Sequence, residues 1–173
     1  RMYLGSHWNS TAQKWEATRG NLDRESVLPL PKLFADMYSE AVKRANRELS
    51  RPQHRKRKVV PFPDGKPPGI GVAEFLPASS SMPMHQDKTG SKESIDDGLP
   101  VMGICIGDSC DFTYGTEAPS GSRKPKALRL ESGDVYLFGG ESRLLWHGVS
   151  KVVAKSAPPS LRLVPGRLSL MLL

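Results

Sequence analysis

Met84-His85-Gln86-Asp87-Lys88 is the stretch that decides the fold of this chain, and it follows an apolar, strand-like opening at Phe75-Leu76-Pro77. Residues i and i+2 of a β-strand point to the same face of a sheet. His85 and Asp87 are therefore expected to project an imidazole and a carboxylate side by side. Two histidines and one carboxylate on one face of an Fe(II) ion leave three coordination positions open for substrates and oxygen. The pair thus predicts a metal site that needs a second histidine from another strand.

The second histidine is expected to be His147. Two short apolar segments precede it, Val135–Phe138 and Leu144–Trp146, and Gly139-Gly140-Glu141-Ser142 between them is a turn signal typical of a β-hairpin. His147 would then stand at the end of a strand, followed by Gly148, where the backbone can turn freely. The pattern predicts a metal site built from strands that are distant in the sequence.

Spacing alone leaves a second interpretation open, because an isolated His-x-Asp pair is more often a surface feature than a ligand pair. The sequence contains four histidines, however, and His7 and His54 lie in polar contexts with few other ligands. His85, Asp87 and His147 therefore stay the candidate ligands.

Five motifs follow one another in a characteristic order. They are His85-Gln86-Asp87-Lys88, then Leu128–Leu130 with Glu131-Ser132-Gly133-Asp134-Val135, then Phe138-Gly139-Gly140-Glu141-Ser142-Arg143-Leu144, then Trp146-His147-Gly148, and finally Pro165-Gly166-Arg167-Leu168-Ser169-Leu170. Taken together they resemble the AlkB family of Fe(II)- and 2-oxoglutarate-dependent oxygenases, which remove alkyl groups from nucleobases. The resemblance extends over roughly the whole chain and is strongest to the plant homologues of the DNA- and tRNA-acting branch.

What the resemblance implies is an oxidative enzyme. Fe(II) would be held by His85, Asp87 and His147, which would also be the catalytic residues, and 2-oxoglutarate would be the co-substrate. Arg167 matches the arginine that holds the far carboxylate of 2-oxoglutarate, a task that suits a planar, bidentate guanidinium. Ser169 takes the place of an asparagine in the same site.

Several positions depart from the family pattern. Glu74 stands where the family usually has asparagine, Leu76 where it has tyrosine, and Leu173 where a second arginine normally binds the near carboxylate of 2-oxoglutarate. A carboxylate at position 74 beside a dianionic ligand is unfavourable unless it is protonated or turned away. Two functions therefore stay open: oxidative demethylation of N-alkylated bases, or a catalytically weak AlkB-like metal-binding protein that acts as a nucleic-acid-binding module.

The substrate implied by the resemblance is DNA or RNA with an alkylated base that is single-stranded or flipped out of a duplex. Trp8 and Trp15 would belong to a nucleotide-recognition lid and stack on the base, although ordinary core packing is an alternative role for both. Thr89 replaces an acidic residue that often reads the base. Basic runs at Arg51–Lys58 and Arg123–Lys126 would contact phosphates or form solvated loops. The lid aromatics and these loops disfavour a cupin-like metal protein that acts on small molecules.

Length and composition set further bounds. With 173 residues the chain is long enough for one domain with a substantial core, and its formal charge of +7 favours a polyanionic partner. Two cysteines, Cys105 and Cys110, are too few for a disulfide framework and suit a reducing intracellular compartment: the nucleus, the cytoplasm or an organelle. No apolar run is long enough for a transmembrane helix or a signal peptide, so no membrane association is expected. We expect a monomer, and, because the sequence opens at Arg1 and not at Met, an excised domain.

The expected fold is mainly β with a supporting helix (α+β), a double-stranded β-helix of the jelly-roll, cupin-like kind. Apolar residues from Leu33 to Leu49 recur at helical spacing and predict the helix. Residues 1–69 would form the lid and this helix, residues 70–173 the jelly-roll core, and Thr89–Gly98 a polar spacer. Short strands are predicted at Gly71–Leu76, Met82–His85, Val101–Ile106, Phe112–Tyr114, Lys126–Leu130, Val135–Phe138, Leu144–His147, Val149–Val153 and Gly166–Leu173.

Overall fold

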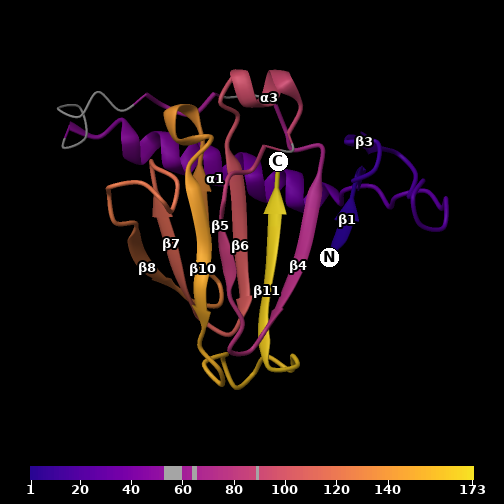
Figure 1. The fold of residues 1–173 in the computed structure, drawn as a ribbon. Helices are drawn as coiled ribbons and strands as arrows, with labels where there is room; N and C mark the ends of the chain where they lie inside the picture. Colours follow the sequence, from indigo (N-terminus) through magenta and orange to yellow (C-terminus); the bar gives the residue numbers. More distant parts are fainter. Residues whose placement is uncertain (53–59, 64–65, 89) are drawn as a thin grey trace.

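The computed structural model describes residues 1–52, 60–63, 66–88 and 90–173. Two antiparallel sheets form the centre of this part of the chain, and one long helix lies behind them (Figure 1). The five-stranded sheet consists, in spatial order, of β1 (Met2–Leu4), β4 (Gly71–Pro77), β11 (Gly166–Leu172), β6 (Val101–Gly107) and β9 (Val135–Phe138). The four-stranded sheet consists of β5 (Met82–His85), β10 (Trp146–Val152), β7 (Cys110–Gly115) and β8 (Lys126–Leu130). A separate hairpin pairs β2 (His7–Asn9) with β3 (Lys14–Glu16).

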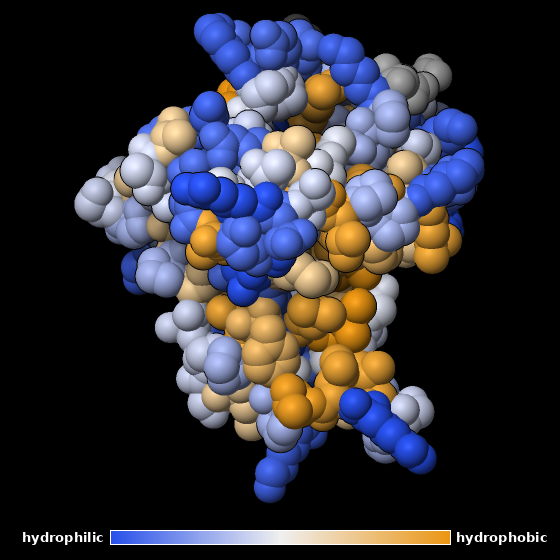
Figure 2. All heavy atoms as spheres, turned by 90° about the vertical axis from the view of Figure 1, so that its right-hand side faces the viewer, coloured by the Kyte–Doolittle hydropathy of each residue, from blue (hydrophilic) through white to orange (hydrophobic). Residues whose placement is uncertain are grey.

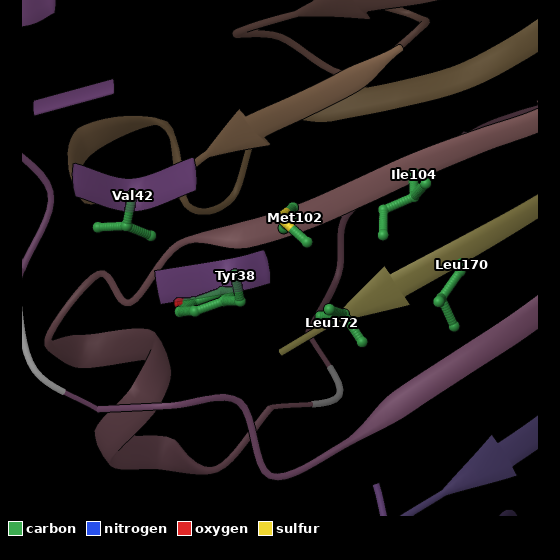
Figure 3. Packing of buried hydrophobic residues seen from close by; sticks show 6 residues of the cluster. All are labelled: Tyr38, Val42, Met102, Ile104, Leu170 and Leu172. Atoms are coloured by element: carbon green, nitrogen blue, oxygen red, sulfur yellow. The ribbon is translucent and has the colours of Figure 1, made fainter. Parts of the chain in front are cut away.

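The helix α1 (Lys32–Leu49) covers one face of the five-stranded sheet. It begins after Pro31 and exposes its charged residues, while its apolar face packs on β6 and β11. Tyr38 and Val42 are its buried side chains, and Figure 3 shows them over a layer of sheet residues, namely Met102, Ile104, Leu170 and Leu172. The Tyr38 hydroxyl also donates a hydrogen bond of 2.8 Å to the carbonyl oxygen of Pro100, which satisfies both buried groups.

A second core layer lies between the two sheets. Successive residues of a strand face opposite sides, so β6 sends Met102 and Ile104 to the helix and Cys105 to the other sheet. Cys105 is packed there with buried strand residues of the four-stranded sheet, namely Cys110, Phe112, Leu130, Val149 and Val152. The inner faces of both sheets thus meet in one apolar layer, and the mainly β, double-stranded β-helix (jelly-roll) prediction is confirmed.

Two connections differ from the predictions made for them. The Gly139–Ser142 segment does not close a hairpin: it holds a short 3-10 helix, η1 (Gly140–Ser142), that carries the chain from β9 in one sheet to β10 in the other. Turn residues between two apolar runs do not reveal which sheet the second run joins. The expected spacer Thr89–Gly98 also contains a short helix, α3 (Lys92–Asp96), whose N-terminus is capped by the Ser91 hydroxyl, which accepts from the Ser94 amide.

The strand that carries His147 also differs. One continuous strand, β10, runs through Gly148, and His147 is its second residue, so the predicted break at Gly148 is wrong. Gly148 serves close packing instead of a turn. A Cβ at this position would lie 2.6 Å from the Met82 carbonyl oxygen of the neighbouring strand β5.

The N-terminal segment lies at one side of the molecule, where β1 extends the large sheet by pairing with β4. Figure 2 views this side and shows hydrophobic side chains over its middle and lower part, with hydrophilic ones above. No helix among the described ranges is long and apolar enough to cross a membrane. The division of the chain at residues 69 and 70 stays a prediction.

Candidate active site

Strand pairing brings the predicted metal ligands together. His85 at the end of β5 lies directly opposite His147 in β10, and Asp87 follows β5 by two residues. The Nε2 atom of His85 is 3.6 Å from Asp87 Oδ1, and the Nε2 atom of His147 is 3.5 Å from Asp87 Oδ2. One nitrogen or oxygen atom from each residue lies within 4.8 Å of the others. Three ligand atoms around one space are the arrangement that a metal ion requires.

The hydrogen bonds of the two histidines orient them for a metal. His85 Nδ1 lies 2.9 Å from the Pro83 carbonyl oxygen, and His147 Nδ1 lies 3.0 Å from the Leu145 carbonyl oxygen. A carbonyl oxygen can only accept, so each Nδ1 carries the hydrogen and each Nε2 keeps its lone pair. Both lone pairs are therefore available on the side of Asp87. Metal-binding histidines are typically oriented by such a hydrogen bond from their second nitrogen.

Burial favours the neutral, metal-binding form of His147. Its side chain is 4 % exposed, and this burial lowers the pKa of the imidazole, although the nearby Asp87 carboxylate acts in the opposite direction. Asp87 is itself buried, and its Oδ2 atom has no hydrogen-bond partner among the described residues. A buried carboxylate oxygen without a partner is costly. A cation between Asp87 and the two Nε2 atoms would remove that cost, so the residues fit an Fe(II) ion.

A cavity of about 190 Å³ adjoins the three candidate ligands. Both sheets and the N-terminal segment contribute to its walls. The lining residues are Arg1, Tyr3, Trp8, Trp15, Val72, Glu74, Leu76, Met82, His85, Gln86, Asp87, Phe112, Tyr136, His147, Gly148, Val149, Arg167, Ser169, Met171 and Leu173. The alternate residues 167, 169, 171 and 173 are all among them, so one face of β11 and the residue after it form a continuous wall.

Arg167 is the buried cation of this cavity, with 2 % of its surface exposed. Its Nη2 donates to the Cys105 sulfur across 2.6 Å, and its Nη1 has no hydrogen-bond partner among the described residues. A thiol is a weak, neutral acceptor, and burial raises the pKa of the Cys105 thiol although Arg167 opposes this shift. The positive charge of Arg167 is therefore not neutralised by a carboxylate, which fits a site for the carboxylate of 2-oxoglutarate.

Ser169 reaches the same cavity and is a hydrogen-bond partner of Tyr136. The Tyr136 ring lies close over Gly103 of the neighbouring strand, where a Cβ would come 2.1 Å from the ring. Burial raises the pKa of the Tyr136 hydroxyl, which therefore stays a neutral donor. Tyr136, Phe112 and Cys105 belong to this site, and sequence reasoning assigned them no role in it.

Glu74, Leu76 and Leu173, the three departures from the family pattern, all line the cavity. Glu74 lines the cavity, and its carboxylate is paired with Arg1, whose Nη2 lies 2.6 Å from its Oε1. Leu173 lines the cavity too, and its backbone pairs with Ile70 through the amide and the carbonyl oxygen of both residues. Arg162, a further arginine close in sequence, is exposed and does not line the cavity.

The two tryptophans of the expected lid lie together at the cavity. Trp8 and Trp15 are a cross-strand pair of the β2–β3 hairpin, with ring centroids 5.4 Å apart and ring planes inclined by 62°. Tyr3 packs edge-on against Trp15 at 5.7 Å. Both indoles line the cavity and are half-buried, so they are not part of the closed core. Thr89, the third expected substrate contact, lies outside the described residues.

Of the two basic segments, Arg123–Lys126 is described in full and Arg51–Lys58 only in part. Most of the Arg51–Lys58 run, its residues 53–58, lies outside the described residues. The Arg123–Lys126 segment borders a second cavity, of about 370 Å³, whose lining includes Met84, the residue before His85. Arg123 pairs with Glu117, with 3.2 Å between Nε and Oε1.

Comparisons with known proteins agree with this geometry. The model of the 2OG-Fe(II) oxygenase superfamily matches residues 2–172. Two Arabidopsis thaliana proteins, the DNA N(6)-methyladenine demethylases ALKBH1D and ALKBH1C, are 34 % and 36 % identical over 98 % of this chain. The alignments cover 38 % and 37 % of those proteins, so the chain spans about two fifths of their length.

Further similarity comes from a tRNA demethylase and from a solved structure. The tRNA demethylase abh1 of Schizosaccharomyces pombe is 37 % identical over 50 % of this chain and 27 % of its own length. The solved structure of OsALKBH1 superposes with a TM-score of 0.87 at 34 % identity, and covers 99 % of this chain and 75 % of that one.

Proposed function

The chain belongs to the 2OG-Fe(II) oxygenase superfamily, whose cofactors are Fe(II) and 2-oxoglutarate, and we propose that it oxidatively demethylates N-alkylated bases in DNA or RNA. One observation carries the proposal: the same cavity is lined by a His85–Asp87–His147 triad, by a buried arginine with a free donor, and by two tryptophans. This combination provides a metal site, an anion site and a stacking surface within reach of one another.

His85, Asp87 and His147 hold Fe(II) through two Nε2 atoms and a carboxylate oxygen in this proposal. The two Nδ1–H groups remain on backbone carbonyl oxygens and fix the imidazole orientation. Arg143 Nη1 donates to the Asp87 carbonyl oxygen across 2.8 Å and holds the backbone that carries the carboxylate. The ligand geometry is thus set before a metal arrives.

Arg167 and Ser169 bind 2-oxoglutarate. The unpartnered Nη1–H of Arg167 donates to the far carboxylate, and such charge-assisted hydrogen bonds contribute about 1.5–3 kcal/mol each. Cys105 keeps the guanidinium in place without neutralising it. The Ser169 hydroxyl and Tyr136 provide neutral hydrogen-bonding groups on the neighbouring wall.

Trp8 and Trp15 receive the base, which must be single-stranded or flipped out because a stacked base cannot reach the metal. Stacking on an aromatic side chain contributes about 1–3 kcal/mol per base. Apolar residues such as Leu76, Phe112 and Val149 exclude water between the stacking surface and the metal ligands. When bound, iron and 2-oxoglutarate supply the oxidation by O₂ of the N-alkyl carbon, with release of succinate, CO₂ and an aldehyde.

A weakly catalytic, nucleic-acid-binding protein is the second candidate function. It is favoured by Leu173 and Glu74, which place an apolar and an acidic side chain in the co-substrate cavity. The deciding experiment incubates the protein with Fe(II), 2-oxoglutarate and methylated DNA or RNA oligonucleotides, and measures succinate, formaldehyde and the demethylated base. Stoichiometric succinate and demethylated base support the enzyme. Oligonucleotide binding without either product supports the binding module.

We also propose that the protein works as a monomer in a reducing compartment of the cell, the nucleus, the cytoplasm or an organelle. The free thiols of Cys105 and Cys110 support the choice of compartment. Light scattering of the purified protein and fractionation of the cell test the two statements.

A further inference from the structure

A row of directly opposed residues crosses the cavity wall of the large sheet. Glu74 in β4 lies opposite Ser169 in β11, and Ser169 lies opposite Cys105 in β6. On the other side of β4, Met2 pairs with Ala73 and Tyr3 with Val72, so Arg1 is next in register to Glu74. Arg1 and Glu74 form an ion pair with 2.6 Å between Nη2 and Oε1. The row therefore begins with an ion pair at the mouth of the cavity.

Glu74 is also a diagonal neighbour of the anion-binding arginine. Arg167 precedes Ser169 by two residues on the same face of β11, and such diagonal Cα atoms are about 7–8 Å apart. Side chains as long as glutamate and arginine can bridge that distance. Without another partner, the Glu74 carboxylate would pair with Arg167 or repel an incoming anion. Both effects would act within a Debye length of about 8–10 Å.

Arg1 removes both effects. The ion pair is partly exposed, with the side chains of Arg1 and Glu74 at 51 % and 21 %, so its contribution to folding stability is small. The ion pair has a larger effect on the charge of the cavity. The Arg1 guanidinium neutralises the carboxylate of Glu74, the acidic residue that lies beside β11 in the cavity wall. It also directs Glu74 toward the edge strand β1 and away from the centre of β11.

We propose that Arg1 is a positioning residue for the anionic co-substrate: it neutralises Glu74 and keeps that carboxylate off Arg167. The inference rests on the proposed function, because it assumes that Arg167 binds a 2-oxoacid. It explains how a glutamate is tolerated in a cavity that must accept a dianion. Leu173 leaves that cavity with fewer positive charges, so the neutralisation of Glu74 gains importance.

The test measures binding of 2-oxoglutarate by calorimetry in the presence of Mn(II), without turnover. Arg1→Gln should raise the Kd for 2-oxoglutarate about tenfold, whereas Arg1→Lys, which keeps the charge, should stay within about twofold of the parent. Glu74→Gln in the Arg1→Gln background should restore the parent affinity. Rescue by a second substitution separates charge neutralisation from a purely structural role of Arg1.

Arg47→Gln is the matched control, because it removes an Arg–Glu ion pair from the exposed side of α1. It should leave the Kd unchanged. The proposal is overturned if Arg1→Gln binds 2-oxoglutarate like the parent, or if the double variant stays as weak as Arg1→Gln alone. Failure of the proposed function looks different: the parent protein itself would then bind no 2-oxoglutarate.

Discussion

Arg143 Nη1 donates a hydrogen bond of 2.8 Å to the backbone carbonyl oxygen of Asp87, and both residues are buried. Arg143 follows η1 and precedes His147 by four residues, so the bond joins the two segments that carry the three candidate ligands. Arg143 Nε has no partner among the described residues, and burial lowers the pKa of the guanidinium. A buried charge with so few acceptors is not retained for stability. Its position indicates that it orients the Asp87 backbone.

Replacement of Arg143 by methionine tests this role. Arg143→Met keeps much of the side-chain volume but loses the bond to Asp87, so affinity for Mn(II) should fall about 10–100-fold, as expected for a residue that orients a ligand. The melting temperature should change less than for removal of a typical core residue. Arg129→Met, which breaks an exposed pair with Asp111 on the outer strand, is the control. Equal metal affinity in Arg143→Met and the parent would rule out the role.

The three candidate ligands should be individually required for metal binding. His147→Ala and Asp87→Ala should each abolish stoichiometric Mn(II) binding at micromolar metal, because two remaining ligands cannot hold a divalent ion tightly. The measurement is metal content after dialysis together with titration calorimetry. His7→Gln is a suitable control, since His7 is also buried but bonds to Asn21 in the N-terminal segment. Full metal content in both alanine variants would show that the ion binds elsewhere.

Much of this site is predictable from local sequence. The His85–Asp87 spacing places two side chains on one face, and alternation predicts the strands that carry Arg167 and Ser169. The sequence does not reveal strand partners. The Gly139–Ser142 turn signal is therefore compatible with a hairpin, yet β9 and β10 belong to different sheets.

The site residues to which the sequence assigns no role were missed for the same physical reason. Tyr136 and Phe112 are ordinary strand residues until the facing sheet is known, and Cys105 is notable only as a free thiol. Their roles depend on which residues lie opposite them across the sheets. By contrast, the start of α3 is predictable from local sequence, because Ser91 followed by Glu93 is typical of a helix N-terminus.

Restoration of the family pattern should strengthen the co-substrate site. Glu74→Asn together with Leu173→Arg removes a negative charge and adds a charge-assisted donor, which contributes about 1.5–3 kcal/mol, or one to two orders of magnitude in affinity. Calorimetry with 2-oxoglutarate and the succinate assay measure the gain. Leu173→Met should leave both values unchanged, because the backbone pairing with Ile70 fixes the position in either variant. A loss of affinity in the restored variant would mean that Leu173 is not aligned with that arginine.

The buried hydroxyl of Tyr38 should make the free energy of unfolding depend on pH in the alkaline range. Burial raises the pKa of this hydroxyl to about 12. The unfolded state loses the proton near its ordinary pKa of about 10, so stability from this group is complete below pH 10 and is lost as the pH rises toward 12. The free energy of unfolding should therefore fall by about 1 kcal/mol at pH 11 relative to Tyr38→Phe. Urea titrations of both proteins from pH 8 to 11 provide the values, and parallel pH curves would contradict the prediction.

The last prediction separates stacking from electrostatic attraction in nucleic-acid binding. Trp8→Ala and Trp15→Ala remove rings that line the cavity, so each should weaken binding of a methylated single-stranded oligonucleotide by about 1–3 kcal/mol, without changing the slope of log affinity against log salt. Lys124→Gln with Lys126→Gln should instead flatten that slope, because fewer counterions are released.

The tryptophan and lysine variants can be compared directly because their side chains lie at different cavities. Lys124 and Lys126 are exposed and border the cavity next to Met84, while the tryptophans lie at the metal cavity. Fluorescence anisotropy at several salt concentrations measures both quantities, and Trp146→Phe, outside both cavities, is the aromatic control. If the tryptophan variants bind as the parent does, their role is packing against Tyr3 within the N-terminal segment. If the lysine variants keep the full salt slope, this loop is a solvated surface, and the phosphate contacts belong to another part of the protein.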